Sequence, residues 1–510
     1  MPAYKRSFPA DMPSPDLTGT LQTGGRPLSR KPLEWQRPFF IFLGIGLFLL
    51  VWLSPSWSPV VDPEGRVIPL SATGQAALAL FLLAATWWMT EVIPIGVTAI
   101  AIGAIQAIVA IRPARTAFTD FMDPSVWFIF GSLMIGMVFT KTGFTRRLAY
   151  RMLTVVGERT SMIYLGCFAM TALLTLVMAH TAVAATVYPL FLAIYALYRE
   201  DAQPTRFGKG LFVGMAFVAG AGSIITLLGA ARGAVAIGFY LEITGRTVTF
   251  FQYTYYMLPV GVLMVFLLWA YVMLWYPPEQ KTIPGLRDRA RRLYASLGPI
   301  TRKEVTAVTI VLGLILALSL RSFVPSLSFL DKSGLILLAT VLFFLLKAVA
   351  LEDLESTSWN IVLLFGGAMS IGHCLWQTGA AEWLAVMWLG AFESAPWHVF
   401  ILGISFFVLI MTNLIMNVAA IAIVLPVALK MAEYVHVAPE VVFFSSLVAA
   451  GMPFLLLVGA APNAIAYSSK MFTTREFFTA GLPASLLLMV VIGLFVWVVW
   501  PLMGMPIQTR

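Results

Sequence analysis

Long apolar runs alternate with short polar loops along most of the chain. About twenty consecutive apolar residues are needed to cross a hydrocarbon core of about 30 Å, so these runs predict membrane-spanning helices. The runs are continuous rather than alternating, which favours helices over the strands of a membrane barrel. The expected spans are 39–53, 72–89, 92–111, 124–141, 210–241, 250–276, 305–323, 333–350, 361–378, 441–469 and 481–502. This is an all-α polytopic membrane protein with about 11 transmembrane helices.

Two further apolar segments, 160–198 and 398–432, are too long to be ordinary spans. At 1.5 Å per residue the first would reach about 58 Å, nearly twice the hydrocarbon thickness. Each has a polar residue near its middle, His180 in the first and Asn417 in the second. The loops at both ends of the first segment are basic, so we expect a re-entrant helix–turn–helix hairpin. Two full spans joined by a very short turn are the alternative.

The polar interruptions belong to a pattern that occurs twice. A proline follows each interruption at the same distance, Pro189 in the first copy and Pro426 in the second. Downstream of each hairpin, a glycine-led break interrupts the next long apolar run, at 229–234 and at 459–464. Two copies with polar groups in the middle of apolar runs are typical of internally duplicated transporters.

The charges of the loops predict how the chain is threaded. Basic residues crowd the loops after 141 and after 198 and the loop 277–304, which we expect on the cytoplasmic side. Five crossings per half would invert the second half, so its hairpin enters from the opposite face. The expected organisation is a disordered cytoplasmic tail at 1–38, a first span and external loop at 39–71, a first inverted repeat at 72–276 with the hairpin 160–198, a basic cytoplasmic linker at 277–304, a second inverted repeat at 305–502 with the hairpin 398–432, and an external tail at 503–510.

Composition supports a protein embedded in a lipid bilayer. Apolar residues make up 60% of the 510 residues and charged residues 11%. The net charge of +9 lies mostly in loops and indicates topology rather than nucleic-acid binding. Cys167 and Cys374 offer neither a disulfide framework nor a metal site, and no cofactor is expected beyond sodium. A cell (inner) membrane of a bacterium fits, with the N-terminus cytoplasmic and the C-terminus external.

The duplicated motifs resemble the divalent anion/sodium symporter family, the di- and tricarboxylate carriers of the ion transporter superfamily, over about residues 70–505. Hairpin tips in that family carry Ser-Asn-Thr. Here the first tip is altered to Ala179-His180-Thr181 and the second to Met416-Asn417-Val418. The resemblance implies an elevator-type carrier, usually a homodimer, that holds a small dicarboxylate or sulfate-like anion between the tips. It also implies one sodium ion beside each tip.

The resemblance gives a set of candidate site residues. Substrate binding is expected at the two tips and the two breaks, and a remaining sodium site is expected in the second half. The substrate candidates are Ala179, His180, Thr181, Arg232, Gly233, Asn417, Val418, Pro462 and Asn463, and the sodium candidates are Thr412, Asn417, Gly459 and Ala460.

The first half departs from the family pattern most. Its tip and break have lost nearly every side-chain oxygen, and two cationic or titratable groups, His180 and Arg232, stand there instead. We expect Arg232 to occupy the first sodium region and to supply the missing charge, or else to be a structural bridge to tip carbonyls. Either residue is a candidate for coupling. An unperturbed histidine titrates near neutral pH, which suggests proton coupling through His180, and a neutral hydrogen-bonding role is the alternative. His373 is expected to be a packed residue with satisfied polar atoms.

The function that follows is secondary transport of a small anion with weakened or absent sodium coupling, by exchange, uniport or proton symport. The alternatives within transport are a sodium-coupled dicarboxylate symporter with one remaining sodium site, or a cation/proton or arsenite-type carrier. Carriers of the last kind need buried acidic residues, and none lies at either tip. An intramembrane enzyme is not expected, because neither His-Glu-x-x-His nor Gly-x-Ser-x-Gly is present.

Overall fold

The computed structural model describes residues 36–61, 65–199, 204–327, 329–389, 396–414 and 416–509. These residues are mostly helical, which confirms an all-α membrane protein. Nine of the described helices are long and apolar enough to cross a membrane, and five shorter ones are apolar. The count of 11 spans therefore stays a prediction. The expected disordered tail 1–38 lies outside the described residues apart from 36–38.

The helices follow the predicted apolar runs closely. In the first half they are α1 (Gln36–Trp52), α2 (Ala72–Thr90), α3 (Ile95–Ile108), α5 (Pro124–Thr142), α7 (Thr160–Thr175), α8 (His180–Tyr198), α9 (Arg206–Ser223), α10 (Arg232–Thr244) and α11 (Phe250–Trp275). In the second half they are α13 (Arg302–Phe323), α14 (Lys332–Leu345), α16 (Trp359–Gln377), α18 (Trp397–Leu414), α19 (Asn417–Tyr434), α20 (Pro439–Gly451), α21 (Ala461–Tyr467) and α22 (Thr474–Leu494), which continues through a π-helical turn into α23 (Trp500–Leu502).

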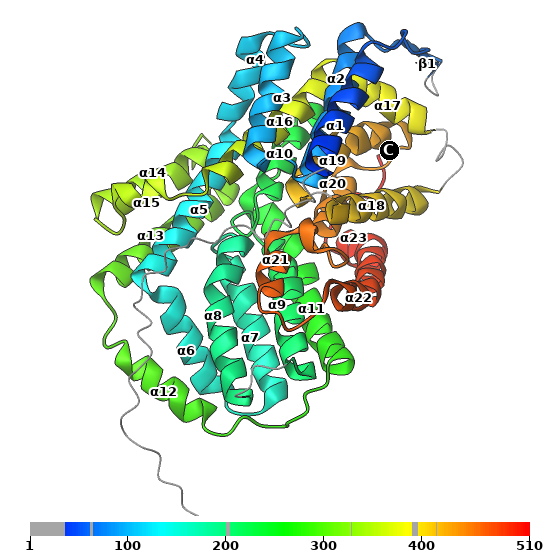
Figure 1. Ribbon diagram of the computed structural model, residues 1–510. Helices are drawn as coiled ribbons and strands as arrows, with labels where there is room; N and C mark the ends of the chain where they lie inside the picture. Colours follow the sequence, from blue (N-terminus) through cyan, green and yellow to red (C-terminus); the bar gives the residue numbers. More distant parts are fainter. Residues whose placement is uncertain are drawn as a thin grey trace, which may run out of the picture.

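Several short elements lie in segments that the sequence pattern assigned to loops. They are a two-stranded ribbon of β1 (Val60–Val61) and β2 (Val67–Ile68), the helices α4 (Ala114–Thr119), α6 (Phe144–Val156), α12 (Leu286–Ser296), α15 (Leu351–Glu355) and α17 (Ala380–Leu389), and the 3₁₀ turns η1 (Asp120–Met122) and η2 (Pro325–Leu327). A third 3₁₀ turn, η3 (Leu457–Gly459), lies inside the predicted span 441–469, just before its break. Helices α6 and α12 are amphipathic and pack together at one end of the molecule (Figure 1). The linker 277–304 is thus partly helical, and the tail 503–510 is held by backbone hydrogen bonds from Ala438 to Ile507 and from Thr509 to His436.

Both long segments break where the polar residues predict. The first break separates α7 from α8 at 176–179, and in the second segment α18 ends at Leu414 and α19 begins at Asn417. The residue before each second arm leaves the helical region, with ψ of 134° at Ala179 and 145° at Met416. Pro189 and Pro426 remain inside α8 and α19. Two helical arms joined by a short turn are therefore present in both halves.

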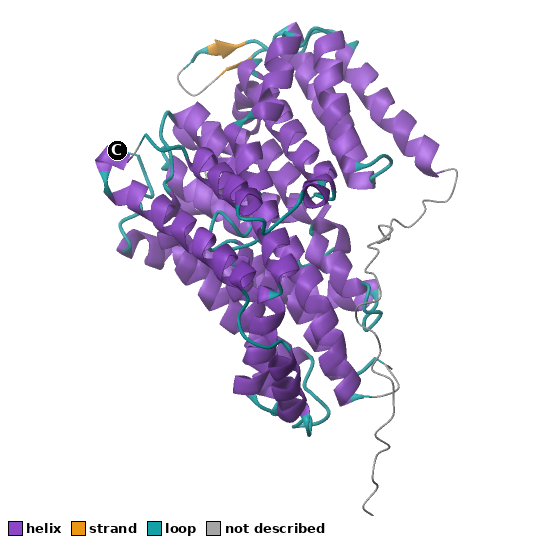
Figure 2. Ribbon diagram, turned by 90° about the vertical axis from the view of Figure 1, so that its left-hand side faces the viewer, coloured by secondary structure: helices purple, strands orange, loops and turns teal. Residues whose placement is uncertain are grey.

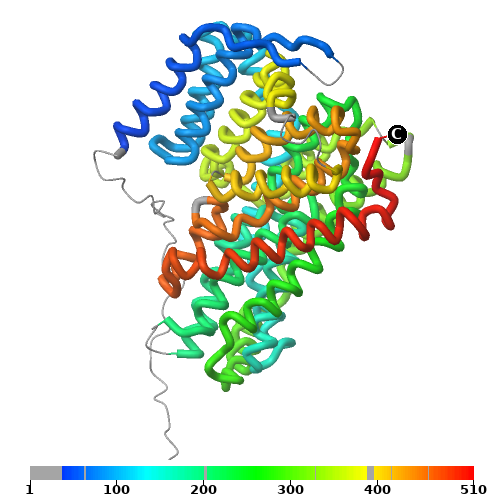
Figure 3. The backbone as a smooth tube through the Cα atoms, turned by 90° about the vertical axis from the view of Figure 1, so that its right-hand side faces the viewer, coloured from blue at the N-terminus to red at the C-terminus, as the bar shows by residue number. Residues whose placement is uncertain are grey.

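The hairpins and the broken helices meet in the middle of the molecule. Helices α7, α8 and α9 lie in the lower part of Figure 1, whereas α16, α19 and α20 lie in the upper part. Figure 2 shows loops crossing this central region, and Figure 3 shows α22 and α23 running along its outer side. Helix α10 packs against α19 and α21 packs against α8, so each half's broken helix contacts the other half's hairpin.

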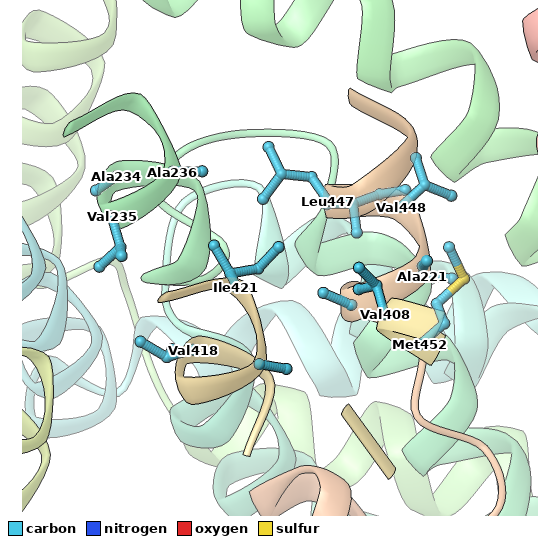
Figure 4. Close-up of a cluster of buried hydrophobic side chains, with 14 of the residues drawn as sticks. Ala221, Ala234, Val235, Ala236, Val408, Val418, Ile421, Leu447, Val448 and Met452 are labelled. Atoms are coloured by element: carbon cyan, nitrogen blue, oxygen red, sulfur yellow. The ribbon is translucent and has the colours of Figure 1, made fainter. Parts of the chain in front are cut away.

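The centre between the halves is tightly packed. Figure 4 shows apolar side chains of α10 (Ala234, Val235 and Ala236), α19 (Val418 and Ile421) and α20 (Leu447 and Val448) in one buried cluster. At the nearby crossing of α9 and α20, a Cβ on Gly220 would lie 2.8 Å from the carbonyl oxygen of Gly451. The two helix backbones can approach this closely only because a side chain is missing there. This packing positions the residues around the tips.

Candidate functional site

The first hairpin tip is held by the break that follows α9. The backbone N–H of His180 donates to the carbonyl of Gly229 at 2.9 Å, and its ring Nδ1 lies 3.2 Å from the same oxygen. The Thr226 hydroxyl donates to the carbonyl of Leu176 at 2.7 Å. Backbone carbonyls that no helix uses are thereby satisfied by the facing segment, as buried polar groups require.

A glycine of each break packs directly on the hairpin of its own half. A Cβ on Gly229 would lie 2.6 Å from the carbonyl oxygen of Thr175, and a Cβ on Gly459 would lie 2.8 Å from that of Thr412. Both threonines are placed five residues before the tip residue, His180 or Asn417. The duplication read from the sequence is thus matched by an equivalent contact in each half.

Side-chain amides organise the break in the second half. Asn413 Oδ1 accepts from the backbone N–H groups of Leu455 and Leu456, at 2.8 and 3.2 Å. Asn463 Nδ2 donates to the carbonyls of Pro453 and Leu456, at 2.8 and 3.1 Å. The sequence singled out Asn463 but missed Asn413. Its only signal was a second polar side chain next to Thr412 in an apolar arm.

Arg232 is the most unusual group at the centre. It is the first residue of α10, and its side chain is buried with 1% exposure. Its Nη2 donates to the Ser223 hydroxyl at 2.8 Å, while Nε and Nη1 have no hydrogen-bond partner among the residues that the structure describes. A Cβ on Gly451 would lie 2.8 Å from Nη2, so the guanidinium lies against α20. No carboxylate of the described residues forms an ion pair with it.

A small cavity adjoins the first tip. It has a volume of about 40 Å³, which suits a water molecule or a single ion and is far smaller than a dicarboxylate. Its wall is mostly apolar, and Ser132, His180 and Thr181 contribute polar groups. The wall is formed by Phe128, Ile129, Ser132, Leu133, Ala179, His180, Thr181, Leu227, Ala230, Ala231, Ile361 and Phe365. Ser132 was missed by the sequence analysis. Its hydroxyl donates to the carbonyl of Leu228 at 2.8 Å and joins α5 to the break.

The predicted site residues are distributed over this central region rather than gathered in one open pocket. Ala179, His180 and Thr181 line the cavity. The other candidates start helices or lie beside the breaks and are largely buried. Arg232 and Gly233 begin α10, Asn417 and Val418 begin α19, Pro462 and Asn463 lie in the first turn of α21, and Gly459 and Ala460 precede that turn.

The candidate sodium ligands of the second half are partly engaged with the protein itself. The hydroxyl of Thr412 donates to the carbonyl of Ala450 at 3.1 Å, and the carbonyl of Thr412 lies against Gly459. Asn417 is 4% exposed at the start of α19. Carbonyl oxygens at breaks of this kind suit a hard cation.

Comparison with known proteins supports a transporter. The family described as "Sodium:sulfate symporter transmembrane region" matches residues 59–505. A sodium-dependent dicarboxylate transporter of Staphylococcus saprophyticus is 25% identical to this chain over 489 residues. The alignment covers 92% of each of the two chains. A protein of the same name from Staphylococcus aureus is 23% identical, with 93% of each chain covered.

Two solved structures share the fold. The chain resembles the YdaH transporter of Alcanivorax borkumensis with a TM-score of 0.55 and 15% identity, covering 92% of this chain and 98% of that one. It resembles MtrF of Neisseria gonorrhoeae with a TM-score of 0.58 and 12% identity, covering 92% and 97%. At these identities the likeness concerns the fold alone.

Proposed function

Because this chain belongs to the sodium:sulfate symporter family, that of the divalent anion/sodium symporters, we propose that it carries a small anion across the membrane with weakened or absent sodium coupling. It is a multi-pass membrane transporter rather than an enzyme. The proposed substrate is a di- or tricarboxylate or a sulfate-like anion. Transport would occur by exchange, uniport or proton coupling. A homodimer with an elevator movement and a cytoplasmic N-terminus belongs to the same proposal.

The buried guanidinium of Arg232 is the main support for this proposal. A charge at this depth costs on the order of 3 kcal/mol on insertion scales, so it needs a role inside the bundle. Its Nε and Nη1 have no partner in the described part of the protein, and a guanidinium binds a carboxylate through two parallel hydrogen bonds. A permanent positive charge beside the first tip would replace the sodium ion that holds the anion in a sodium symporter.

The first tip adds a second positive feature. Helix α8 begins at His180 and α10 begins at Arg232, so two helix N-termini lie beside the cavity region. Free N–H groups and the positive dipole ends of helices favour an anion. Before an anion the size of a dicarboxylate can enter, the cavity of about 40 Å³ must widen, which a movement of the hairpins would allow.

His180 fits a neutral hydrogen-bonding role better than a charged one. Its Nδ1 faces the carbonyl of Gly229, which suits an Nδ1–H donor, and Arg232 stands nearby. A second positive charge next to a guanidinium in an apolar region is electrostatically unfavourable. Proton coupling through His180 stays a prediction that would require this repulsion to be overcome.

A second candidate function is sodium-coupled dicarboxylate symport with one ion. It is favoured by the second half, where Asn417, Pro462 and Asn463 keep the family residues and Thr412 lies against Gly459. A cation/proton or arsenite-type carrier ranks lower, because neither tip provides an acidic residue.

Binding of the anion is tested with the purified protein in detergent. We expect one of succinate, malate, tartrate, citrate or sulfate to raise the melting temperature in sodium-free buffer, since a ligand that binds only the folded state stabilises it. The same anion should drive counterflow in proteoliposomes. Chloride at equal ionic strength is the control. If no anion of the panel shifts the melting temperature or supports counterflow, with or without sodium, the proposal is wrong.

A further inference from the structure

A buried polar cluster lies apart from the hairpin tips, between α10 and α16. His373 on α16 uses both ring nitrogens: Nδ1 lies 2.9 Å from Asp120 Oδ1, and Nε2 lies 2.9 Å from Glu242 Oε2. Asp120, in η1, is also paired with Arg112. Gln377 Nε2 donates to the other oxygen of Glu242 at 3.3 Å. Carboxylates from two separate segments, η1 and α10, therefore converge on one imidazole ring.

Asp120 is held in place by Arg112, which itself has several hydrogen-bond partners. Arg112 donates to Gln106 and Gln377 at 2.8 Å each and to the carbonyl of Ser370 at 3.2 Å, besides its ion pair with Asp120. The Asp120 side chain is 8% exposed. Because this carboxylate has a permanent cationic partner, its charge is balanced without any contribution from His373.

The contact between His373 and Glu242 requires one proton more than a neutral imidazole and two ionised carboxylates provide. A neutral imidazole carries a single N–H and can donate to only one of the two carboxylates. If Nδ1–H donates to Asp120, a lone pair of Nε2 faces Glu242 at 2.9 Å, which is repulsive unless a proton lies between them. That proton can reside on Nε2 or on the Glu242 carboxyl. The Glu242 side chain is 27% exposed, so the proton can exchange with water.

Within the described part of the chain, no other charged group forms an ion pair with His373 or Glu242 at this contact. The buried Cys374 is the next residue on α16. Asp123 caps α5 through the Ser125 N–H, and Lys430 on α19 pairs with Glu433 at 2.8 Å and with Glu382 at 3.7 Å. Other charged residues described on the elements packed against α10 and α16 are paired elsewhere or exposed. Lys141 on α5 pairs with Asp353, and Arg246 pairs with Glu440 at 3.3 Å, whereas Glu91 and Arg115 are exposed.

We propose that His373 and Glu242 hold one exchangeable proton and that this proton stabilises the contact between α10 and α16. We call this contact of His373 with Glu242 the latch. In the latched form a proton taken from water completes an N–H···O contact between Nε2 and the Glu242 carboxylate, and it returns to water when the contact opens. The ring of Phe239 packs edge-on against His373 at 5.5 Å, and Gly372 gives Phe239 room. The latch therefore lies in a close contact of the two helices.

The latch connects to the anion site through a single rigid helix. Arg232 begins α10 and Glu242 lies ten residues later, about 15 Å along the axis at 1.5 Å per residue. The following link rests on the proposed transport function. If α10 moves during transport and carries Arg232 with it, the same movement also opens the latch. The exchangeable proton then moves with the transport step. Glu242 and His373 lie toward the C-terminal ends of α10 and α16, and Asp120 lies in the turn before α5. The topology predicted from the loop charges puts these ends on the external side, so external acid would favour the latched form.

The proton site is tested first without any transport assay. Glu242→Gln keeps the shape of the side chain and removes the need for the proton. The proton bound in the folded protein stabilises it, so stability is present at low pH and is lost as the pH rises above about 6.5, the ordinary His value. The melting temperature of the purified wild-type protein should fall by about 2 °C or more relative to Glu242→Gln between pH 6 and 9. His373→Gln should flatten the profile in the same way.

A matched control is Glu440→Gln, which removes a carboxylate from an ion pair whose Arg246 side chain is 72% exposed. Its pH profile should follow the wild type. Parallel profiles for wild type, Glu242→Gln and His373→Gln would overturn the proton site. In proteoliposomes, the external-pH dependence of anion exchange should be lost in Glu242→Gln, and retention of that dependence would overturn the link to transport. Absence of exchange in every protein would refute the proposed function, while the melting profiles still decide the latch.

Discussion

Arg232→Ala is expected to lower sodium-free anion exchange by about tenfold to a hundredfold, and added sodium should restore part of the lost rate. A hydrogen bond to a charged group contributes about 1.5–3 kcal/mol, and each 1.4 kcal/mol corresponds to a factor of ten. With the guanidinium gone, the space near Ser223 and the carbonyls around Gly229 can accept a cation again. Initial rates in proteoliposomes with and without sodium measure both effects.

Two substitutions serve as controls for this prediction. Arg232→Lys keeps a positive charge but cannot bind a carboxylate through two parallel bonds, so it should retain sodium independence with weaker affinity. Arg246→Ala removes an exposed arginine just beyond the same helix and should leave the rates unchanged. Wild-type kinetics in Arg232→Ala would show that the guanidinium has a structural role only.

Alanine at Gly229 or Gly459 is expected to abolish transport and to lower the melting temperature strongly. The new Cβ at Gly229 would lie 2.6 Å from the carbonyl oxygen of Thr175, and the Cβ at Gly459 would lie 2.5 Å from Pro453 Cβ and 2.8 Å from the carbonyl oxygen of Thr412. Backbone and proline atoms cannot move aside as a flexible side chain can, so overpacking of about 1–3 kcal/mol or more should result. Thermal unfolding and counterflow of both variants test this directly.

Gly313→Ala is the matched control, because Gly313 lies inside helix α13 and a Cβ there meets no atom within 4 Å. This substitution should be neutral or slightly stabilising, since alanine favours a helix more than glycine does. If Gly229→Ala and Gly459→Ala behave like Gly313→Ala, then the packing of each break on its hairpin is not what holds the central region together.

The sequence predicted the helices well because membrane helices are encoded by local composition. An apolar run needs no distant partner to be recognised, and a polar residue in its middle marks a break. His180 and Asn417 are each the first residue of a second hairpin arm, as their positions in the runs suggested. The two fold relatives and the family match agree with this architecture.

The sequence predicted amphipathic elements and long-range polar contacts poorly. Helices α6 and α12 carry charged faces, so no apolar run marks them, and their pairing depends on tertiary contacts such as the hydrogen bond that Arg287 Nε donates to the carbonyl of Thr154 at 3.2 Å. The cluster of Asp120, Glu242 and His373 joins residues more than a hundred positions apart. His373 was expected to be a satisfied packed residue, and its partners show that satisfaction requires two carboxylates.

In the proposed mechanism, the fixed guanidinium of Arg232 replaces sodium in holding the anion. The most direct measurement is wild-type counterflow of the anion selected by the thermal panel, with sodium replaced by choline on both sides of the membrane. We expect the initial rate to stay within about a factor of two of the rate in sodium. Loss of counterflow in choline, with a saturable activation by sodium, would contradict it and identify the chain as a sodium-coupled symporter.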